Sequence, residues 1–300
     1  MGDGMILVTG ATGKVGKELV NDLRARKCDF KVMVRSKEAE KAFESRGIKV
    51  AHGDFERPAS YAEALTGIQQ VFLLTTPHPD CPKLEREFLK ACKTKGVQHV
   101  VRLSAIGANP WSSSVLLSCH GRCEAQLEES GLACTVLRPS MFMQNLAPFM
   151  GPTVAKESTL YAPAGAALMP CVDTRDIAAV AGTLLAMPGS GYPVYEITGP
   201  EAITYTGIAE RLSLALGRRI AYVDVPDGAA LNSMVGMGMS PWMAEGLVTL
   251  YHTFKENGHS ALTFDTVERV TGRAPRTIDA YIQENLAAFR ATSQVKVTHS

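Results

Sequence analysis

The sequence lacks both a surplus of charge of either sign and any long apolar run. Its 31 basic and 30 acidic side chains leave a formal net charge of +1, so no strong field attracts nucleic acid or an anionic membrane. No stretch of 18 or more apolar residues occurs, which argues against a transmembrane helix. The first 25 residues also lack the basic-then-apolar pattern of a leader. We therefore expect a cytoplasmic protein that binds a small molecule, not nucleic acid or a membrane.

Cysteine is present, but not in the patterns that indicate disulfides or metal sites. The seven cysteines form an odd set with no C-x-x-C pair, which favours reduced thiols. Cys119 and Cys123 would share a helix face, yet only Arg122 nearby could lower a thiol pKa, so a redox pair is not favoured. No sequence cluster indicates a metal site, and none is expected.

Apolar side chains make up 46% of the 300 residues, enough for a large core. Short β-rich runs alternate with helical patterns through the first half of the chain. Strands separated by helices predict right-handed crossovers and a parallel sheet with both faces covered. The fold class is therefore α/β, a Rossmann-type doubly wound sheet. The expected strands are 5–8, 30–34, 48–50, 71–74, 97–103, 134–138 and 195–197.

After about residue 145 the alternation weakens, and proline and glycine punctuate the chain. Asp173 is expected to cap a helix that follows it, so residues 171–200 should contribute to the first domain, 1–150. Residues 151–300 should form a smaller, mostly helical lobe that binds the substrate. Its expected elements are helices near 206–216, 241–255 and 276–290 and a strand at 221–225, with a frayed tail at 293–300.

A glycine-rich turn follows the first strand and opens an amphipathic helix. This is the context in which such a turn binds the pyrophosphate of a dinucleotide. Gly10 allows a tight turn, Gly13 allows close approach of the phosphates, and Gly16 allows the helix to pack on the strand. A glycine turn without a ligand is the less favoured alternative. The predicted dinucleotide-binding residues of this segment are Gly10, Thr12, Gly13, Lys14, Val15 and Gly16.

The end of the second strand indicates which dinucleotide is preferred. An NAD-binding protein often has a carboxylate there for the ribose 2′-hydroxyl. Here Arg35 and Lys37 follow the strand, and these cations suit the 2′-phosphate of NADP. The sequence therefore predicts NADP, with NADPH preferred over NADH, unless the two residues are only solvated loop charges.

Two further strand ends are candidate parts of the same site, because ligands of open parallel sheets gather at the carboxyl ends of the strands. Asp54 and Phe55 follow the third strand, where an adenine ring could rest. Thr75, Thr76 and Pro77 follow the fourth. Each segment could equally be an ordinary loop cap or turn.

Five motifs in a fixed order resemble the NmrA-like branch of the atypical short-chain dehydrogenases/reductases. They lie at 10–16, 53–58, 103–109, 120–124 and 137–145. The resemblance covers nearly the whole chain and is closest to quinone reductases and triphenylmethane dye reductases. It implies a cleft between a Rossmann domain and a smaller domain. It also implies that Thr75, Thr76 and Ser104 line the cofactor, and that the segment from Pro139 through Phe142 to Asn145 lies beside the nicotinamide.

One departure from the wider superfamily concerns the catalytic Tyr-x-x-x-Lys pair. At the usual position this chain has His120-Gly-Arg-Cys-Glu124. The pattern does occur at Tyr251 and Lys255, but so late in the chain that we interpret it as coincidence. His120 and Glu124 would share a helix face, and the carboxylate could raise the pKa of the imidazole and make it a proton donor. A simple surface pair is the equal alternative.

Ser104 could donate a hydrogen bond to the substrate, unless the backbone already satisfies it. Several methionines and aromatic residues from Met141 onward could line an adaptable apolar cleft or simply pack in the core. The leading hypothesis is an NADPH-dependent oxidoreductase that reduces a quinone-like or other electron-poor aromatic molecule. The alternatives are a non-catalytic NADP(H) sensor and a biosynthetic reductase or isomerase. A homodimer is one assembly that the sequence allows.

Overall fold

The structure is a computed structural model that describes residues 4–187, 191–256 and 258–290. Its strands are β1 (Met5–Val8), β2 (Phe30–Val34), β3 (Lys49–His52), β4 (Ile68–Leu73), β5 (His99–Leu103), β6 (Ala133–Pro139), β7 (Thr159–Ala162), β8 (Val194–Ile197) and β9 (Ala221–Asp224). The α-helices of the described residues are α1 (Lys14–Ala25), α2 (Lys37–Glu44), α3 (Pro58–Ala64), α4 (Cys81–Thr94), α5 (Val115–Glu129), α6 (Leu146–Glu157), α7 (Thr174–Ala186), α8 (Tyr205–Leu216), α9 (Asp227–Gly236), α10 (Pro241–Lys255), α11 (Thr266–Thr271), α12 (Ile278–Glu284) and α13 (Leu286–Phe289).

Seven of the strands form one sheet in the order β3-β2-β1-β4-β5-β6-β8. Every neighbouring pair is parallel. The order reverses direction between β1 and β4, so the segments that follow these two strands lead to opposite sides of the sheet, and the carboxyl ends of such strands are the usual ligand position. The expected Rossmann-type doubly wound sheet is confirmed.

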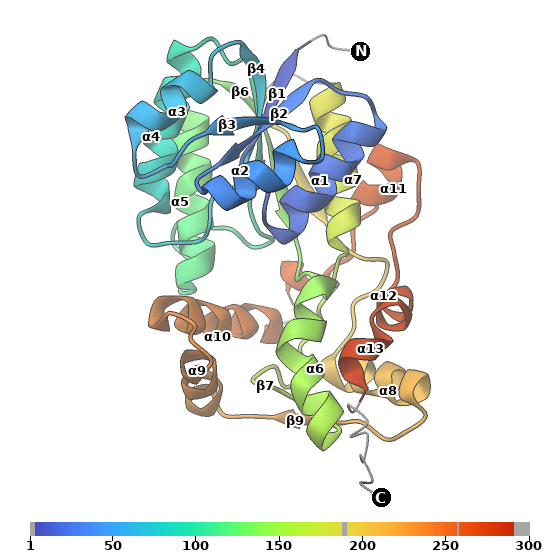
Figure 1. The fold of residues 1–300 in the computed structure, drawn as a ribbon. Helices are drawn as coiled ribbons and strands as arrows, with labels where there is room; N and C mark the ends of the chain where they lie inside the picture. The colour runs from blue at the N-terminus through green and yellow to red at the C-terminus, as the bar shows by residue number, and fades with distance from the viewer. Residues whose placement is uncertain (1–3, 188–190, 257, 291–300) are drawn as a thin grey trace, which may run out of the picture.

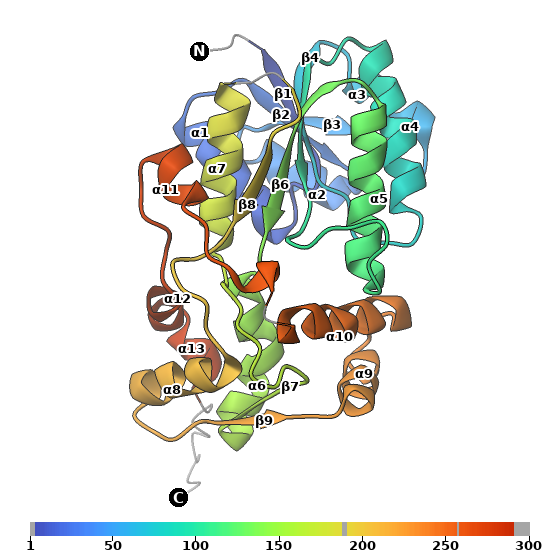
Figure 2. The ribbon, with the colours of Figure 1, turned by 180° about the vertical axis from the view of Figure 1, so that it is seen from behind.

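Helices cover both faces of this sheet (Figures 1 and 2). One apolar cluster joins β1 and β2 to α1, α2, α7 and α11, and a second joins the opposite face to α3, α4 and α5. β1 is apolar on both sides, with Ile6 and Val8 in one cluster and Leu7 in the other, as burial on both faces requires. Asp173 caps α7 by accepting from the backbone N–H of Arg175, as the sequence predicts.

The remaining elements lie beyond the carboxyl ends of the strands (Figure 1). α6 leads into this part, and β7 pairs in parallel with β9 to make a small second sheet. A third apolar cluster joins them to α8, α10, α12 and α13. α11 returns to pack on α7 and β8, so a short piece of the region after residue 151 belongs to the layer over the large sheet.

The secondary structure corrects the sequence-based expectations for several elements. α6 continues through Gly151 and Pro152, where the sequence indicates only punctuation. A Cβ on Gly151 would lie 2.7 Å from the carbonyl oxygen of Ala288, so close packing against α13 offsets the poor helix propensity. β7 and α9 were not expected, and the helix expected at 276–290 is divided into α12 and α13. The tail at 293–300 lies outside the described residues.

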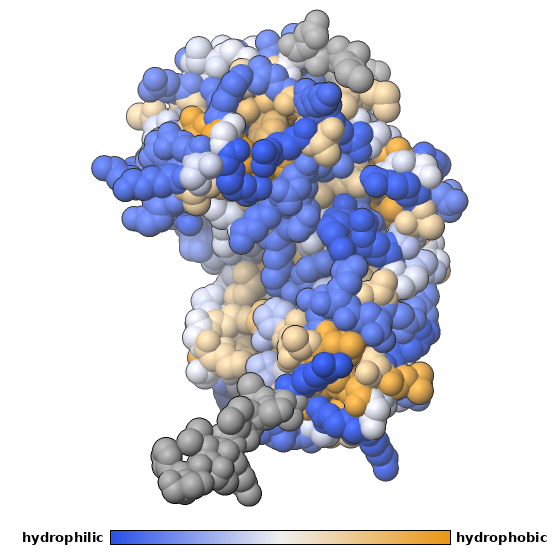
Figure 3. Space-filling view, turned by 45° about the vertical axis from the view of Figure 1, so that its right-hand side comes forward, coloured by the Kyte–Doolittle hydropathy of each residue, from blue (hydrophilic) through white to orange (hydrophobic). Residues whose placement is uncertain are grey.

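The surface in Figure 3 is mostly hydrophilic, and hydrophobic residues gather in separate, smaller areas on both parts of the molecule. Within the described ranges, no helix combines the length and apolar character that crossing a membrane requires.

Candidate active site

The turn between β1 and α1 requires glycine at two of its positions. Gly10 has a φ of +63°, in the left-handed region that favours glycine, and a Cβ there would lie 2.7 Å from Cγ of Leu74. A Cβ on Gly16 would lie 2.8 Å from Cα of Ala11 and still closer to the carbonyl oxygen of Gly10. The first turn of α1 therefore packs directly against the backbone of the loop, as the glycine spacing predicts.

The N-terminus of α1 is free to receive an anion. Gly13 is its N-cap residue, no side chain caps the helix, and its first turn contains no acidic residue. The unpaired N–H groups and the helix dipole favour negative charge at this end. Lys14 adds an ammonium group beside it. The Nζ of Lys14 donates to Oδ1 of Asn145 at 2.5 Å and lies 5.5 Å from the centre of the Phe149 ring, and this partial burial lowers the pKa of Lys14.

A groove of about 380 Å³ runs along the carboxyl ends of β1 to β4, and we call it the strand-end groove. It brings together loops that are far apart in the sequence. Lys37 is exposed at the start of α2 and does not line the groove. The residues predicted to bind the dinucleotide that do line it are Gly10, Thr12, Arg35, Asp54, Phe55, Thr75, Thr76 and Pro77.

The side chains of the groove have different environments. Arg35 is exposed at the end of β2. The Phe55 ring packs on Phe88 with ring centres 4.9 Å apart, which leaves an aromatic wall facing the groove. The carboxylate of Asp54 accepts from the backbone N–H of Glu56 at 3.1 Å and from Arg57 at 3.2 Å. Asp54 thus holds its own loop closed while it lines the groove.

The loop after β4 is tied to a buried ion pair. The hydroxyl of Thr75 donates to Oε1 of Glu85 at 2.6 Å, and Nε of Arg102 donates to Oε2 of the same carboxylate at 2.7 Å. The side chains of Arg102 and Glu85 are only 2% and 1% exposed. This pair therefore connects β5 and α4 to a loop that lines the groove.

Ser104 and Glu124 do meet, but Glu124 has a different partner from the one expected. The hydroxyl of Ser104 donates to Oε1 of Glu124 in a short hydrogen bond, and Arg138 donates to both oxygens of that carboxylate at 3.0 and 2.6 Å. The carboxylate is therefore occupied by a serine and an arginine. These contacts hold the ends of β5 and β6 together, since Ser104 and Arg138 lie at those ends.

The expectation that Glu124 raises the pKa of His120 is wrong. His120 has no hydrogen bond to that carboxylate, and its buried Nδ1 has no partner among the described residues. Burial, together with the nearby guanidinium of Arg102, lowers the pKa of His120 to about 3. Its imidazole is therefore neutral at physiological pH, so His120 cannot supply a proton as an imidazolium ion.

This environment makes stability depend on pH. The ordinary pKa of histidine is 6.5, so below that pH His120 is protonated in the unfolded chain. In the native protein His120 stays neutral until about pH 3. Native stability should therefore fall as the pH drops through this window, by up to about 1.4 kcal/mol per pH unit. In urea titrations, His120→Gln should reduce the loss between about pH 7.5 and about pH 5 by about 2 kcal/mol. An equal loss in both proteins would contradict this environment.

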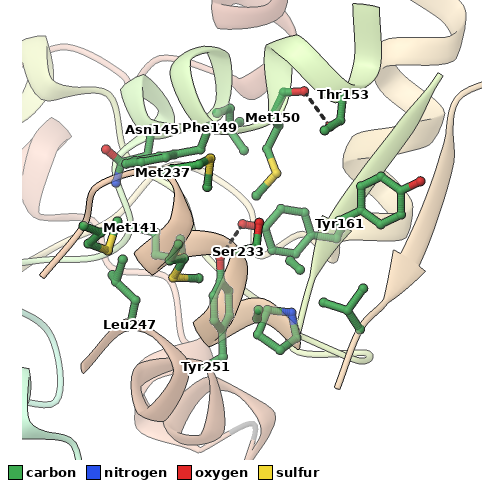
Figure 4. Close-up of a pocket in the computed structure, with 18 of the residues that line it drawn as sticks. Met141, Asn145, Phe149, Met150, Thr153, Tyr161, Ser233, Met237, Leu247 and Tyr251 are labelled. Carbon is green, nitrogen blue, oxygen red and sulfur yellow. Dashed lines mark hydrogen bonds between the residues drawn. The ribbon is translucent and has the colours of Figure 1, made fainter. Parts of the chain in front are cut away.

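A second cavity of about 330 Å³ lies between the carboxyl end of β6 and the helical part, and we call it the apolar cavity (Figure 4). Phe142 and Asn145 line it, as does Tyr161. Of the methionines and aromatic residues after Met141 that the sequence offers for a cleft, Met143 is buried in the core and Trp242 does not line the cavity. Five methionines from three segments contribute flexible, polarisable side chains: Met141, Met150, Met234, Met237 and Met239.

Two further tyrosines line this cavity, Tyr205, which no sequence pattern singled out, and Tyr251, whose pattern was interpreted as coincidence. Tyr251 of α10 points into it (Figure 4), and Tyr205 of α8 also lines it. Their hydroxyl oxygens are 2.7 Å apart. Lys255 does not line the cavity, so the late Tyr-x-x-x-Lys pattern forms no catalytic pair. The tyrosine of that pattern nevertheless lies at the candidate site, and only the fold could reveal it.

All seven cysteines have free thiols. Cys119 contacts not only Cys123 but also Cys81, whose thiol donates to the carbonyl oxygen of Thr76 at 3.0 Å beside the strand-end groove.

The described residues contain no group of three or more His, Cys, Asp or Glu side chains suited to a metal ion.

Comparison with known proteins identifies relatives of nearly the same length. The model of the NmrA-like family matches residues 2–285. NAD(P)H azoreductase from Xenophilus azovorans is 37% identical over 287 residues, which cover 96% of this chain and 100% of that protein. NADPH-dependent quinone oxidoreductase from Escherichia coli, solved with NADPH, superposes with a TM-score of 0.85 at 23% identity and covers 94% of this chain and 100% of its own. Citrobacter triphenylmethane reductase, solved with NADP(H), gives 0.82 at 23%, covering 94% and 99%; both structures support the fold.

Proposed function

The chain belongs to the NmrA-like family, and from this premise we propose that it is an NADPH-dependent reductase of planar, electron-poor aromatic molecules of the azo or quinone class. The family expected from the five motifs is confirmed. The chain is an NAD(P)H-dependent oxidoreductase, in keeping with the azoreductase that is 37% identical to it over almost all of both chains. NADPH as the preferred cofactor and the class of acceptor are the parts that we propose.

The observation that carries the proposal is the hydrogen bond between Lys14 and Asn145, which places the apolar cavity next to the N-terminus of α1. Asn145 lines the apolar cavity and accepts a hydrogen bond from Lys14 in the first turn of α1. The apolar cavity therefore begins beside the end of the helix that follows the glycine turn. A dinucleotide with its pyrophosphate at the N-terminus of α1 and an aromatic molecule in the apolar cavity would meet beside Asn145.

The groove fits a dinucleotide in shape and in chemistry. Gly10 and Gly16 allow the tight packing of the turn, and the uncapped helix end would bind the pyrophosphate. The aromatic wall at Phe55 suits the adenine, and Arg35 suits a 2′-phosphate. When bound, the reduced nicotinamide supplies the hydride. The remaining requirement, holding an acceptor in place, falls to the apolar cavity.

The lining of the apolar cavity favours flat aromatic acceptors. Methionine side chains adapt to ligands of different outline and make favourable contacts with aromatic rings. Phe142 and Phe149 provide rings from the side of α6. Electron-poor acceptors delocalise the charge that hydride addition creates, and quinones in particular need little acid-base assistance in order to accept a hydride. The chain can therefore act without the tyrosine and lysine pair of the wider superfamily.

The cofactor preference can be tested at Arg35. Arg35→Asp should weaken NADPH binding about 10- to 100-fold, the worth of charge-assisted hydrogen bonds to a phosphate, and should change NADH binding far less. Titration of nicotinamide fluorescence measures both dissociation constants. Lys41→Asp makes the same charge change on the far part of α2 and should leave both constants unchanged. Equal losses for NADPH and NADH in the Arg35 variant would refute the assignment.

The activity itself is tested by stopped-flow decay of NADPH absorbance against a panel of azo dyes and quinones. Oxidation of NADPH that depends on an acceptor is the expected result. Tight NADPH binding without turnover of any acceptor would contradict the proposal and would point to a sensor of the cofactor.

A further inference from the structure

The two tyrosines of the apolar cavity form a pair of phenols in a setting with few other polar groups. Tyr205 and Tyr251 are 1% and 6% exposed. Tyr205 is held by stacking on Tyr222, with ring centres 5.6 Å apart and an angle of 21°. Tyr251 projects from α10 and presents its hydroxyl to the cavity (Figure 4). The pair is therefore rigid, water-poor and adjacent to the space for an acceptor.

One of the two hydroxyl hydrogens of this pair has no acceptor within the pair. Each phenol carries one O–H donor, and the single hydrogen bond between the two oxygens uses only one. In the part of the chain that the structure describes, neither hydroxyl has another hydrogen-bond partner. When Tyr205 donates to Tyr251, the O–H of Tyr251 is free to donate to a molecule in the cavity. Buried polar groups are seldom left without a partner, so the site suits a ligand with an acceptor atom.

Burial keeps both phenols neutral. It raises the pKa of Tyr251 to about 12 and raises that of Tyr205 well above its ordinary value. Such a group donates a hydrogen bond at every ordinary pH. It gives up its proton only to a base stronger than a phenolate.

We propose that Tyr251, oriented by Tyr205, donates a hydrogen bond and then its proton to the nitrogen that becomes anionic when a hydride is added to a bound azo compound. This inference rests on the proposed function and specifies the azo group as the acceptor class that needs Tyr251. Tyr251 is the catalytic residue here, and Tyr205 is a positioning residue.

Reduction of the azo group forms two N–H bonds in turn. The hydride forms an N–H bond at one nitrogen of the N=N group, and the π pair moves to the other nitrogen. That nitrogen takes the proton of Tyr251, while the O–H bonding pair stays on the phenolate oxygen. The product is the hydrazine, reduced by two electrons. Tyr205 donates its O–H to the phenolate, and water returns the proton after the product leaves.

Reduction of a quinone depends less on the proton of Tyr251 than reduction of an azo compound does. Hydride addition to a quinone produces an aryl oxide, whose conjugate acid has a pKa of about 10, as for tyrosine itself. Proton transfer from Tyr251 to that oxygen is not downhill, whereas transfer to a nitrogen anion, a far stronger base, is. The two acceptor classes should therefore respond differently to loss of the hydroxyl.

The test compares Tyr251→Phe and Tyr205→Phe with the wild type in the presence of NADPH. With an azo dye, Tyr251→Phe should lower kcat about 100-fold, within the usual range for loss of a general acid, with KM nearly unchanged and a smaller solvent isotope effect. With 1,4-naphthoquinone the loss should be only a few-fold. Tyr205→Phe should cause a smaller loss with the dye. Tyr195→Phe, on β8 outside both cavities, is the matched control.

A binding measurement adds a readout that does not depend on turnover. The visible band of 4-(dimethylamino)azobenzene should shift on binding to the wild type and to Tyr195→Phe, and should lack the hydrogen-bond part of that shift in Tyr251→Phe. Equal losses with dye and quinone, or full activity of Tyr251→Phe with the dye, would overturn the inference and leave the proposed function intact. A wild type that reduces neither acceptor would overturn both.

Discussion

Gly16→Ala should lower the affinity for NADPH more than 100-fold and should also destabilise the fold. The added methyl group would lie 2.8 Å from Cα of Ala11 and closer still to the carbonyl oxygen of Gly10, and neither backbone atom can move without opening the turn. Overpacking of this kind costs about 1–3 kcal/mol. The displaced turn would no longer present its N–H groups to the pyrophosphate.

Gly13→Ala is the matched variant, because it separates binding from folding. Gly13 has a φ of −77°, which alanine adopts without strain, and its Cβ would lie 3.2 Å from the carbonyl oxygen of Gly10. We expect a Tm close to that of the wild type but much weaker NADPH binding, since the methyl group stands where the phosphates approach. Thermal unfolding and fluorescence titration measure the two effects. If both variants bound NADPH with wild-type affinity, the glycine turn would not be part of the cofactor site.

The second large effect is expected at the buried ion pair. Glu85→Leu should destabilise the protein by about 3–5 kcal/mol, because it leaves the guanidinium of Arg102 buried without its carboxylate. Burial alone would lower the pKa of Arg102, but the adjacent Glu85 carboxylate raises it. The guanidinium therefore stays charged inside the protein. The hydroxyl of Thr75 would lose its acceptor in the same variant.

Two controls make this result specific. The double variant with Glu85→Leu and Arg102→Met should recover much of the loss, since apolar residues often replace a buried pair without large cost. Lys49→Met breaks the exposed pair of Lys49 and Asp29 and should cost about 1 kcal/mol or less. Urea unfolding provides the free energies. A double variant that is less stable than Glu85→Leu alone would contradict the assignment.

The large sheet could be predicted from the sequence because its signals are local. β1 is an uninterrupted apolar run and β2 is apolar except for Lys31. The glycine spacing of 10–16 contains its own geometric reason. The loops at Arg35, Phe55 and Thr75 were found because the carboxyl ends of parallel strands share one edge of the sheet. Burial and partner choice were not predictable in this way. Glu124 lies one helical turn from His120, but Arg138, from the next strand, is the residue that binds it.

The helical part was less predictable, since tertiary contacts decide its structure. Packing against Ala288 maintains α6 through Gly151 and Pro152, and no local pattern indicates that contact. Tyr205 and Tyr251 are separated by 46 positions and come together only because α8 and α10 pack around one cavity. No local signal distinguishes Tyr205 from an ordinary core tyrosine, and the Tyr-x-x-x-Lys pattern at Tyr251 does not reveal the contact between the two.

The hydrogen bond between Lys14 and Asn145 has a thermodynamic consequence. A ligand that binds the Lys14 ammonium must compete with the Asn145 oxygen. Binding of this ligand therefore changes the binding free energy of any molecule that contacts Asn145 in the apolar cavity. Linkage requires this influence to be equal in both directions. Binding of the ligand at Lys14 and of the ligand in the apolar cavity forms one thermodynamic cycle. The total free energy of binding both ligands is the same whichever binds first.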